Sequence, residues 1–250
     1  MPGMNPDVAA QEEEGQLLAD PRRVAILTAV IVAVTAGLFA AVASHGVLSS
    51  IQQLDAAWLR LMLSGRAEPL TALAKVFNIL GLVYVTLPVR IAVAGFLAVR
   101  RQWWHLSAFI AAVLLSEALI GPLKGIYDRV RPAGSLVATS GASFPSGHAV
   151  AASVTVIAAV FALVPAGRRA RLTLAAVTFS ILMGLSRAYL GAHWLSDAAA
   201  GILLGTSCAL VTALVTDQIQ RRQGSRRHAA ESPGPVGLPR DRAGGRQGPA

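Results

Sequence analysis

The sequence predicts an all-α integral membrane protein with six transmembrane helices and an interfacial amphipathic helix between the first and the second. Hydrophobic residues make up 54% of the 250 residues and charged residues only 14%, and the mean hydropathy is +0.56. A soluble domain usually carries about 25% charged residues. Several apolar runs also approach the roughly 20 residues that a helix needs to cross a bilayer.

The apolar runs define the expected spans. They cover residues 24–43, 70–99, 106–123, 148–164, 172–186 and 194–215. Pro88 and Arg90 interrupt the second run near its inner end. The motif AVAS at 41–44 resembles a signal-peptidase site, but the acidic leader and the length of the first run favour a retained helix.

Residues 47–63 differ from the spans because they are amphipathic. Apolar residues recur at helical spacing (Val47, Ile51, Leu54, Trp58 and Leu61), and Gln52, Gln53, Asp55 and Arg60 occupy the other faces. This pattern is typical of a helix that lies in the membrane interface, with Trp58 at headgroup depth. A packed connector between two spans is an equally good interpretation.

The charge distribution predicts the topology. The net charge of +9 could suggest a nucleic-acid partner, but the arginines form short clusters between apolar runs, so no nucleic-acid binding is expected. With six spans, all clusters fall on one side (Arg22/Arg23, Arg100/Arg101, Arg168/Arg169/Arg171 and Arg221/Arg222/Arg226/Arg227). The positive-inside rule makes that side the cytoplasm and puts both termini there.

Two polar segments flank the expected membrane domain of residues 21–220. The N-terminus, residues 1–20, carries three consecutive glutamates, and the basic tail, residues 221–250, is rich in proline, glycine and arginine. The first segment is polar and the second has no pattern that a core could use, so both are expected to be disordered.

Three polar segments converge on the expected outer side. They are KGIYDRVRP at 124–132, PSGH at 145–148 and SRAYLGAHWLSD at 186–197. Consecutive antiparallel helices would bring these segments together. Lys124, Arg131 and Arg187 supply three cations, which are costly near a membrane without a partner.

A phosphate is the partner that this chemistry favours. The planar fork of arginine suits phosphate oxygens. Ser146 and Gly147 immediately precede an expected helix, whose first N–H groups have no partner within the helix and bind anions. The sequence therefore predicts a phosphate-binding site.

Two histidines lie in the same segments. His193 and Asp197 are four residues apart and share a helix face, so the carboxylate can fix the imidazole tautomer and leave one ring nitrogen free to attack. His148 comes from another helix and can protonate a departing oxygen. A metal site is the alternative, but three cations would repel a metal ion and no third ligand is near, so no metal and no cofactor are predicted.

The ordered motifs Lys-x6-Arg-Pro, Pro-Ser-Gly-His and Ser-Arg-x5-His-x3-Asp resemble those of the type 2 phosphatidic acid phosphatase (PAP2) superfamily. The resemblance spans roughly residues 124–197 without a departure. Three ordered motifs are highly specific, whereas PSGH alone is weak. Six spans with an amphipathic segment after the first fit the membrane branch.

The resemblance implies a metal-independent lipid phosphatase that works through a phosphohistidine intermediate. It implies that His193 is the nucleophile, that Asp197 orients it and that His148 is the general acid. The residues implied to hold the phosphate are Lys124, Arg131, Ser146, Gly147 and Arg187. Asp128 falls at a variable position of the first motif and is interpreted as a salt-bridge partner for a neighbouring arginine.

The expected partners are membrane lipids and a lipid phosphate or diphosphate substrate at the outer leaflet of a bacterial inner membrane. Family analogy favours undecaprenyl diphosphate, with phosphatidate or phosphatidylglycerophosphate as the alternative. Vanadium-dependent haloperoxidases belong to the same superfamily but look like soluble proteins. A transporter or a non-catalytic lipid-binding protein is a further alternative, and it would not need both histidines and Asp197.

Overall fold

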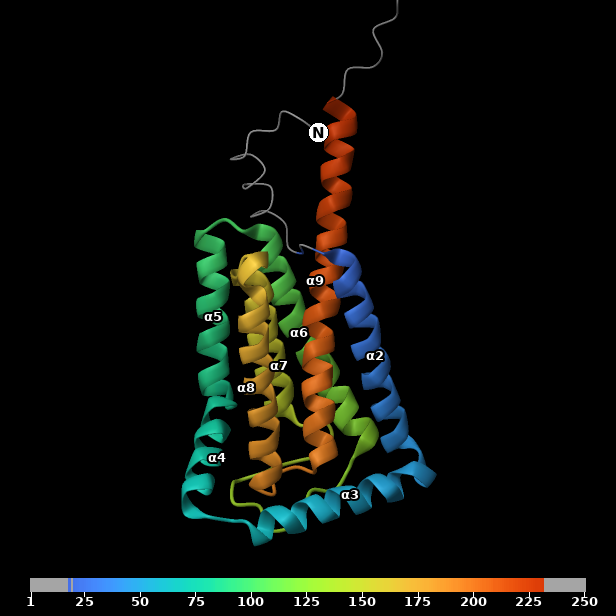
Figure 1. Cartoon of the computed structure of the whole chain (residues 1–250), viewed down its shortest axis with the longest axis vertical. Coiled ribbons are helices and arrows are strands. Elements are labelled where there is room, and N and C mark those ends of the chain that lie inside the picture. Colours follow the sequence, from blue (N-terminus) through green and yellow to red (C-terminus); the bar gives the residue numbers. More distant parts are fainter. Residues whose placement is uncertain (1–17, 19, 232–250) are drawn as a thin grey trace, which may run out of the picture.

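The protein is a bundle of roughly parallel helices with one helix lying across its end (Figure 1). The computed structural model describes residue 18 and residues 20–231. Its helices are α2 (Pro21–Ala43), α3 (His45–Ser64), α4 (Glu68–Leu80), α5 (Val83–Val99), α6 (Trp103–Tyr127), α7 (Gly147–Leu163), the short η1 (Ala166–Arg168), α8 (Arg169–Tyr189) and α9 (Leu195–Glu231). No strand occurs in these residues, and the all-α prediction is confirmed.

Four described helices, α2, α6, α8 and α9, are each long and apolar enough to cross a membrane. Helices α4 and α5 pass the same test only as a pair, which is bent by 52°. Helix α7 is apolar but only 17 residues long. The prediction of a helical membrane protein is confirmed, whereas the count of six spans is not.

The second expected span is broken at Gly81–Leu82 and not at Pro88, which lies inside α5. A Cβ atom on Gly81 would lie 2.5 Å from Cδ2 of His148. Only a residue without a Cβ lets the backbone come so close to the ring. The break therefore brings the α4–α5 junction against one of the two predicted catalytic histidines.

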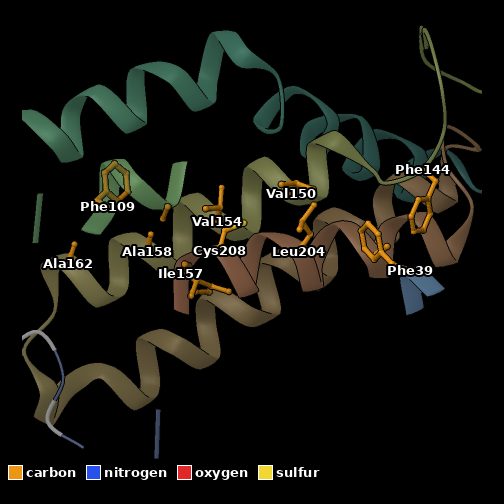
Figure 2. Packing of buried hydrophobic residues seen from close by; sticks show 14 of the residues in the cluster. Phe39, Phe109, Phe144, Val150, Val154, Ile157, Ala158, Ala162, Leu204 and Cys208 are labelled. Atoms are coloured by element: carbon orange, nitrogen blue, oxygen red, sulfur yellow. The ribbon is translucent and has the colours of Figure 1, made fainter. Parts of the chain in front are cut away.

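Helix α7 is the centre of the bundle and packs against α5, α6, α8 and α9. Its Val150, Val154 and Ile157 are buried in the main core cluster (Figure 2). Small residues allow α7 and α9 to approach closely, as is common between helices in membranes. A Cβ on Gly201 of α9 would lie 2.6 Å from the carbonyl oxygen of Ser146. This approach fixes the start of α7 beside the start of α9.

Helix α3 crosses one end of the bundle (Figure 1). Its Asp55 is buried at 3% exposure, whereas Leu54 and Leu61 are 71% and 57% exposed. Some apolar side chains of α3 are therefore free to contact lipid, as the interfacial interpretation requires, whereas Ile51 packs against the core and Gln53 and Arg60 are exposed. Helix α3 also contacts α8 and α9, so it is packed against the bundle as well.

Helix α9 is longer than expected, because it continues to Glu231. The boundary expected at residue 220 lies inside this helix, and residues 221–231 are helical where a disordered tail was expected. Buried Asp217 pairs with Arg221 one turn later, at 2.7 Å, and accepts a hydrogen bond from the backbone N–H of Leu18. This contact ties α9 to the segment before α2. The expected disorder of residues 1–17 and 232–250 lies outside the described residues.

The arginine clusters gather at one end of the bundle. The start of α2, the α5–α6 turn, the start of α8 and the last turns of α9 lie there, and α3 crosses the opposite end (Figure 1). By the positive-inside rule we expect the arginine-rich end to face the cytoplasm, and this orientation stays a prediction.

This orientation predicts the outcome of thiol labelling in intact cells. In a Cys208→Ser background, a membrane-impermeant thiol reagent is expected to label Leu136→Cys and not Gly167→Cys. Both positions should react after the cells are permeabilised, which controls for accessibility. Labelling of position 167 alone in intact cells would reverse the orientation.

Candidate active site

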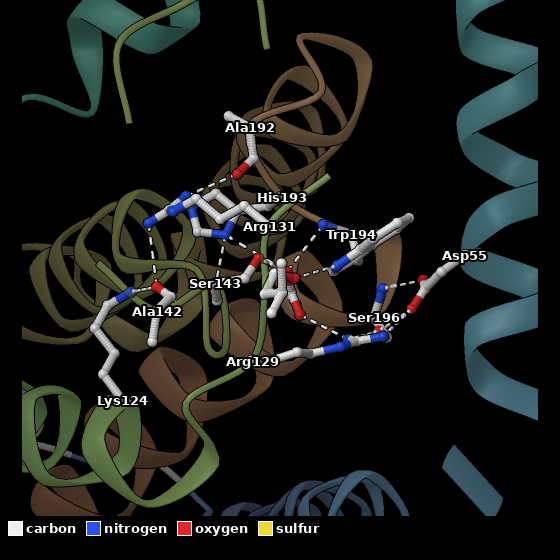
Figure 3. A network of polar contacts seen from close by, with 12 residues as sticks. Asp55, Lys124, Arg129, Arg131, Ala142, Ser143, Ala192, His193, Trp194 and Ser196 are labelled. Atoms are coloured by element: carbon white, nitrogen blue, oxygen red, sulfur yellow. Dashed lines mark hydrogen bonds and ion pairs between the residues drawn. The ribbon is translucent and has the colours of Figure 1, made fainter. Parts of the chain in front are cut away.

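The predicted site residues lie on segments that meet at the end of the bundle that α3 crosses (Figure 1), and Figure 3 shows Lys124, Arg131 and His193 among them. Lys124 lies in the last turn of α6, Arg131 in the following loop, Ser146 at the N-cap of α7, Gly147 and His148 in its first turn, Arg187 in the last turn of α8, His193 in the α8–α9 loop and Asp197 in the first turn of α9. Lys124 was expected in a loop, but α6 continues to Tyr127.

His193 is held at both ring nitrogens. Its Nδ1 lies 2.8 Å from the carbonyl oxygen of Ser143, and its Nε2 lies 3.1 Å from Nη1 of Arg131. A carbonyl can only accept and a guanidinium can only donate, so Nδ1 carries the proton and Nε2 keeps its lone pair. Nε2 is therefore the nitrogen that is equipped to attack.

Asp197 acts on His193 at a longer distance than the sequence suggests. Its Oδ2 lies 3.6 Å from Nδ1 of His193, farther than the Ser143 carbonyl. Oδ2 accepts hydrogen bonds from the Ser143 hydroxyl and from the backbone N–H of Trp194, and Oδ1 accepts one from Arg129 at 2.7 Å. The fully buried carboxylate thus fixes the loop that carries His193 and puts a negative charge beside the ring.

The environment keeps the His193 ring neutral. Burial, the largest effect, lowers the pKa of His193, Asp197 opposes it, and Arg131 and Arg187 add to the lowering, so that the pKa is about 4 in place of 6.5. The neutral form therefore dominates at physiological pH. A nucleophilic imidazole requires this form, because the protonated ring has no lone pair to donate.

Backbone carbonyls hold two of the predicted cations in place. Arg131 donates to the carbonyl oxygens of Ser140, Gly141, Ala142 and Ala192 at 2.7–3.1 Å. Lys124 donates to the Ala142 carbonyl at 2.6 Å. A carbonyl carries no net charge, so it positions these side chains without neutralising them. The positive charge beside Nε2 of His193 therefore stays available to an anion.

Three buried polar atoms of the site residues predicted from the sequence have no hydrogen-bond partner among the described residues: the hydroxyl of Ser146, Nε2 of His148 and Nε of Arg187; Nε of Arg129 is also without one. An unsatisfied buried polar group costs about 1–3 kcal/mol. All three belong to residues predicted from the sequence, and Arg187, His193 and Arg131 are close enough to His148 to act on it electrostatically. Phosphate oxygens and a leaving-group oxygen would satisfy these atoms.

Sequence reasoning missed four residues of the site: Asp55, Asn78, Arg129 and Ser143. The Asn78 side chain accepts a hydrogen bond from Nη1 of Arg187. It is the single amide in the apolar stretch VFNIL, and a lone polar residue in an apolar stretch could have indicated a role in the site. Arg129 lies inside the first motif, two residues before Arg131. The partners of Arg129 lie on α3 and α9, and the residue spacing around Arg129 in the sequence does not indicate contacts with such distant helices.

Asp128 does not fill the role expected of it. It is exposed and ends α6 in a left-handed conformation, with φ of 33°. Arg129 makes its ion pairs with Asp55 and Asp197, each at 2.7 Å. Asp128 instead serves as the C-cap of α6, where its αL conformation turns the chain.

The described residues contain no group of three histidine, cysteine or acidic side chains that could hold a metal ion. The donors that converge on Nε2 of His193 are cationic or neutral, and they suit an anion.

Comparisons with known proteins agree with this geometry. Residues 105–221 match the family model of the PAP2 superfamily, and this range includes all three motifs. Phosphatidylglycerophosphatase B of Bacillus subtilis (strain 168) is 32% identical over 119 residues, which are 45% of this chain and 58% of that protein. The chain therefore spans less than two thirds of the curated relative that it matches.

Two solved structures are similar to large parts of this chain. A transmembrane PAP2-type phosphatidylglycerolphosphate phosphatase from Bacillus subtilis has a TM-score of 0.61 and 25% identity, over 78% of this chain and 96% of that chain. LpxE of Aquifex aeolicus has a TM-score of 0.54 and 26% identity, over 64% of this chain and 94% of that chain.

The lowered pKa of His193 predicts a measurable titration. In protein labelled with ¹⁵N-histidine, the resonance that is lost in His193→Gln is expected to titrate with a midpoint near 4. The unfolded state binds the proton more tightly, so this histidine costs stability as the pH falls below 6.5. A midpoint near 6.5 would show that the ring is not buried as described.

Proposed function

We propose that this membrane protein is a phosphatase that removes a phosphate group from a lipid, because residues 105–221 match the family model of the PAP2 superfamily. The observation that carries the proposal is the cluster of unsatisfied donors and cations around Nε2 of His193. The first candidate substrate is phosphatidylglycerophosphate, which the names of two similar proteins suggest.

The charge of the site fits a phosphomonoester dianion. Its ionised side chains are four cations, Lys124, Arg129, Arg131 and Arg187, and two carboxylates, Asp55 and Asp197, which together leave a charge of +2. A dianionic phosphate balances this charge. Such electrostatic stabilisation is strongest where the donors are already in place before the charge develops.

In the proposed mechanism, Nε2 of His193 attacks the phosphorus and the ester P–O bond breaks. His148 donates a proton to the departing lipid oxygen. Lys124, Arg131 and Arg187, with Ser146 and the first N–H groups of α7, stabilise the charge on the equatorial oxygens. Water then attacks the phosphohistidine, and His148 accepts its proton. Phosphate departs, and His193 returns to its neutral state.

An apolar groove beside the site supports a lipid substrate. Its volume is about 310 Å³, and its lining includes Trp58 of α3, Phe77 of α4 and Leu182 of α8. Phe77 directly precedes Asn78, and Ser186, at the same groove, directly precedes Arg187. A hydrocarbon chain in this groove would place its phosphate end near the cations.

We propose that the protein lies in a bacterial inner membrane with its active site at the outer leaflet. The arginine-rich end of the bundle and both termini would then lie in the cytoplasm. Undecaprenyl diphosphate, which family analogy favours, stays a prediction. We rank phosphatidylglycerophosphate ahead of undecaprenyl diphosphate as a substrate because the site charge of +2 equals the charge of one phosphomonoester dianion in magnitude. A transporter or a non-catalytic lipid-binding protein would not release phosphate.

A substrate panel tests the function. The purified protein in detergent is expected to release inorganic phosphate from phosphatidylglycerophosphate faster than from phosphatidate or undecaprenyl diphosphate, and to do so in EDTA. His193→Ala is the matched inactive control. No release from any lipid phosphate by folded protein would refute the function. Activity that is lost in EDTA and restored by magnesium would refute the cationic cage.

The division of labour between the histidines gives a second test. His148→Ala is expected to lower kcat by about 10²–10⁴-fold on a lipid phosphate, because the alkoxide then leaves unprotonated. The loss should shrink with a nitrophenyl phosphate, whose leaving group needs little protonation. His193→Ala should abolish turnover of both substrates. Equal losses on both substrates in His148→Ala would contradict its role as the acid.

A further inference from the structure

We propose that Arg129, clamped by Asp55 of the crossing helix α3, is a positioning residue that sets how Asp197 acts on His193. Its consequence for turnover rests on the proposed function, whereas its effect on the His193 ring does not. Arg129 does not contact His193 in the structure, so any influence passes through Asp197.

Arg129 lies between two carboxylates from distant parts of the chain (Figure 3). Its Nη1 donates to Oδ1 of Asp197 and to the hydroxyl of Ser196, both at 2.7 Å. Its Nη2 donates to Oδ2 of Asp55 and to Oε1 of Gln52, again at 2.7 Å. The rigid guanidinium therefore fixes the spacing between α3 and the start of α9.

Asp55 makes this clamp specific to the start of α9. Its Oδ1 accepts a hydrogen bond from the backbone N–H of Ser196 at 2.9 Å, and its Oδ2 accepts one from the Ser196 hydroxyl at 2.6 Å. Ser196 directly precedes Asp197. A carboxylate at a helix N-terminus satisfies N–H groups that have no partner within the helix. Helix α3 thus holds both the first turn of α9 and the arginine that pairs with Asp197.

The clamp also divides one positive charge between two carboxylates. Asp55 is 3% exposed and Asp197 is fully buried, so solvent screens this arrangement little. If Asp55 were neutral, the charge of Arg129 would act on Asp197 alone. If Arg129 were neutral, Asp197 would keep an uncompensated negative charge beside the His193 ring.

Removing the charge of Asp55 should therefore lower the pKa of His193, and removing the charge of Arg129 should raise it. The charged and titratable groups that face His193 are Asp197 from α9, Arg131 from the α6–α7 loop, Arg187 from α8 and His148 from α7. Asp197 is the one anion among them, so His193 is sensitive to how far Asp197 is neutralised. A clamp that served only to hold α3 would give no such pair of opposite shifts.

The experiment follows the His193 resonance in full-length ¹⁵N-histidine-labelled protein. In Asp55→Asn the midpoint is expected to fall, and in Arg129→Gln it is expected to rise by about one pH unit. Asp128→Asn is the matched control, because it removes a neighbouring but exposed carboxylate, and its midpoint should not change. An unchanged His193 midpoint in folded Asp55→Asn and folded Arg129→Gln would overturn the proposal.

Arg129→Gln leaves two buried carboxylates without their cation, and this change can prevent folding. The double variant Asp55→Asn/Arg129→Gln removes one charge of each sign and keeps the balance, and its midpoint should still rise. A fall in the double variant would contradict the proposal, and so would a rise in Asp55→Asn alone.

Kinetics then connect the clamp to turnover. Asp55→Asn and Arg129→Lys are expected to lower kcat by roughly 10- to 100-fold with KM little changed, because the cage itself is intact. Arg129→Lys should retain more activity than Arg129→Gln, since a lysine still neutralises Asp197. If the His193 midpoint shifts as expected in the variants but the wild type has no phosphatase activity, the proposed function is refuted and the clamp is not. Full activity in Asp55→Asn would refute the clamp alone.

Discussion

The structure depends on the buried carboxylate of Asp197. A charge inside a membrane protein is costly unless it is paired and hydrogen-bonded. Asp197 meets this requirement with the hydroxyl of Ser143, the N–H of Trp194 and the guanidinium of Arg129. These partners come from the segment before α7, from the α8–α9 loop and from the loop after α6. One side chain therefore brings the polar segments of the bundle together.

The site combines strong positive charge with little neutralisation. Lys124 and Arg131 donate to carbonyl oxygens of residues 140–142, and Arg187 donates to the amide of Asn78. Neutral acceptors position the cations without cancelling their charge. The one cation paired with acids is Arg129, and it lies on the far side of Asp197 from the cage.

Close backbone approach makes this density of polar groups possible. Gly201 lets the start of α7 lie against α9, and Gly81 lets the α4–α5 break lie against the ring of His148. In each case a methyl group would occupy the place of atoms that the site needs. The 52° bend between α4 and α5 therefore interrupts an otherwise apolar span at the place where it contacts the polar site.

The sequence by itself determined the helical membrane fold and the three motifs, because hydrophobic periodicity and local residue spacing are properties of contiguous segments. It also supplied the candidate site residues, from Lys124 to Asp197, whose roles stay predictions. It misplaced the break in the second span and the end of α9, since contacts with His148 and with Leu18 decide those boundaries. Only the tertiary structure decided that Ser143, and not Asp197, lies closest to Nδ1 of His193, and that Asp55 shares Arg129 with Asp197. The pairing of Asp55 with Arg129 joins residues 74 positions apart in the chain, and the packing of α3 across the bundle creates it.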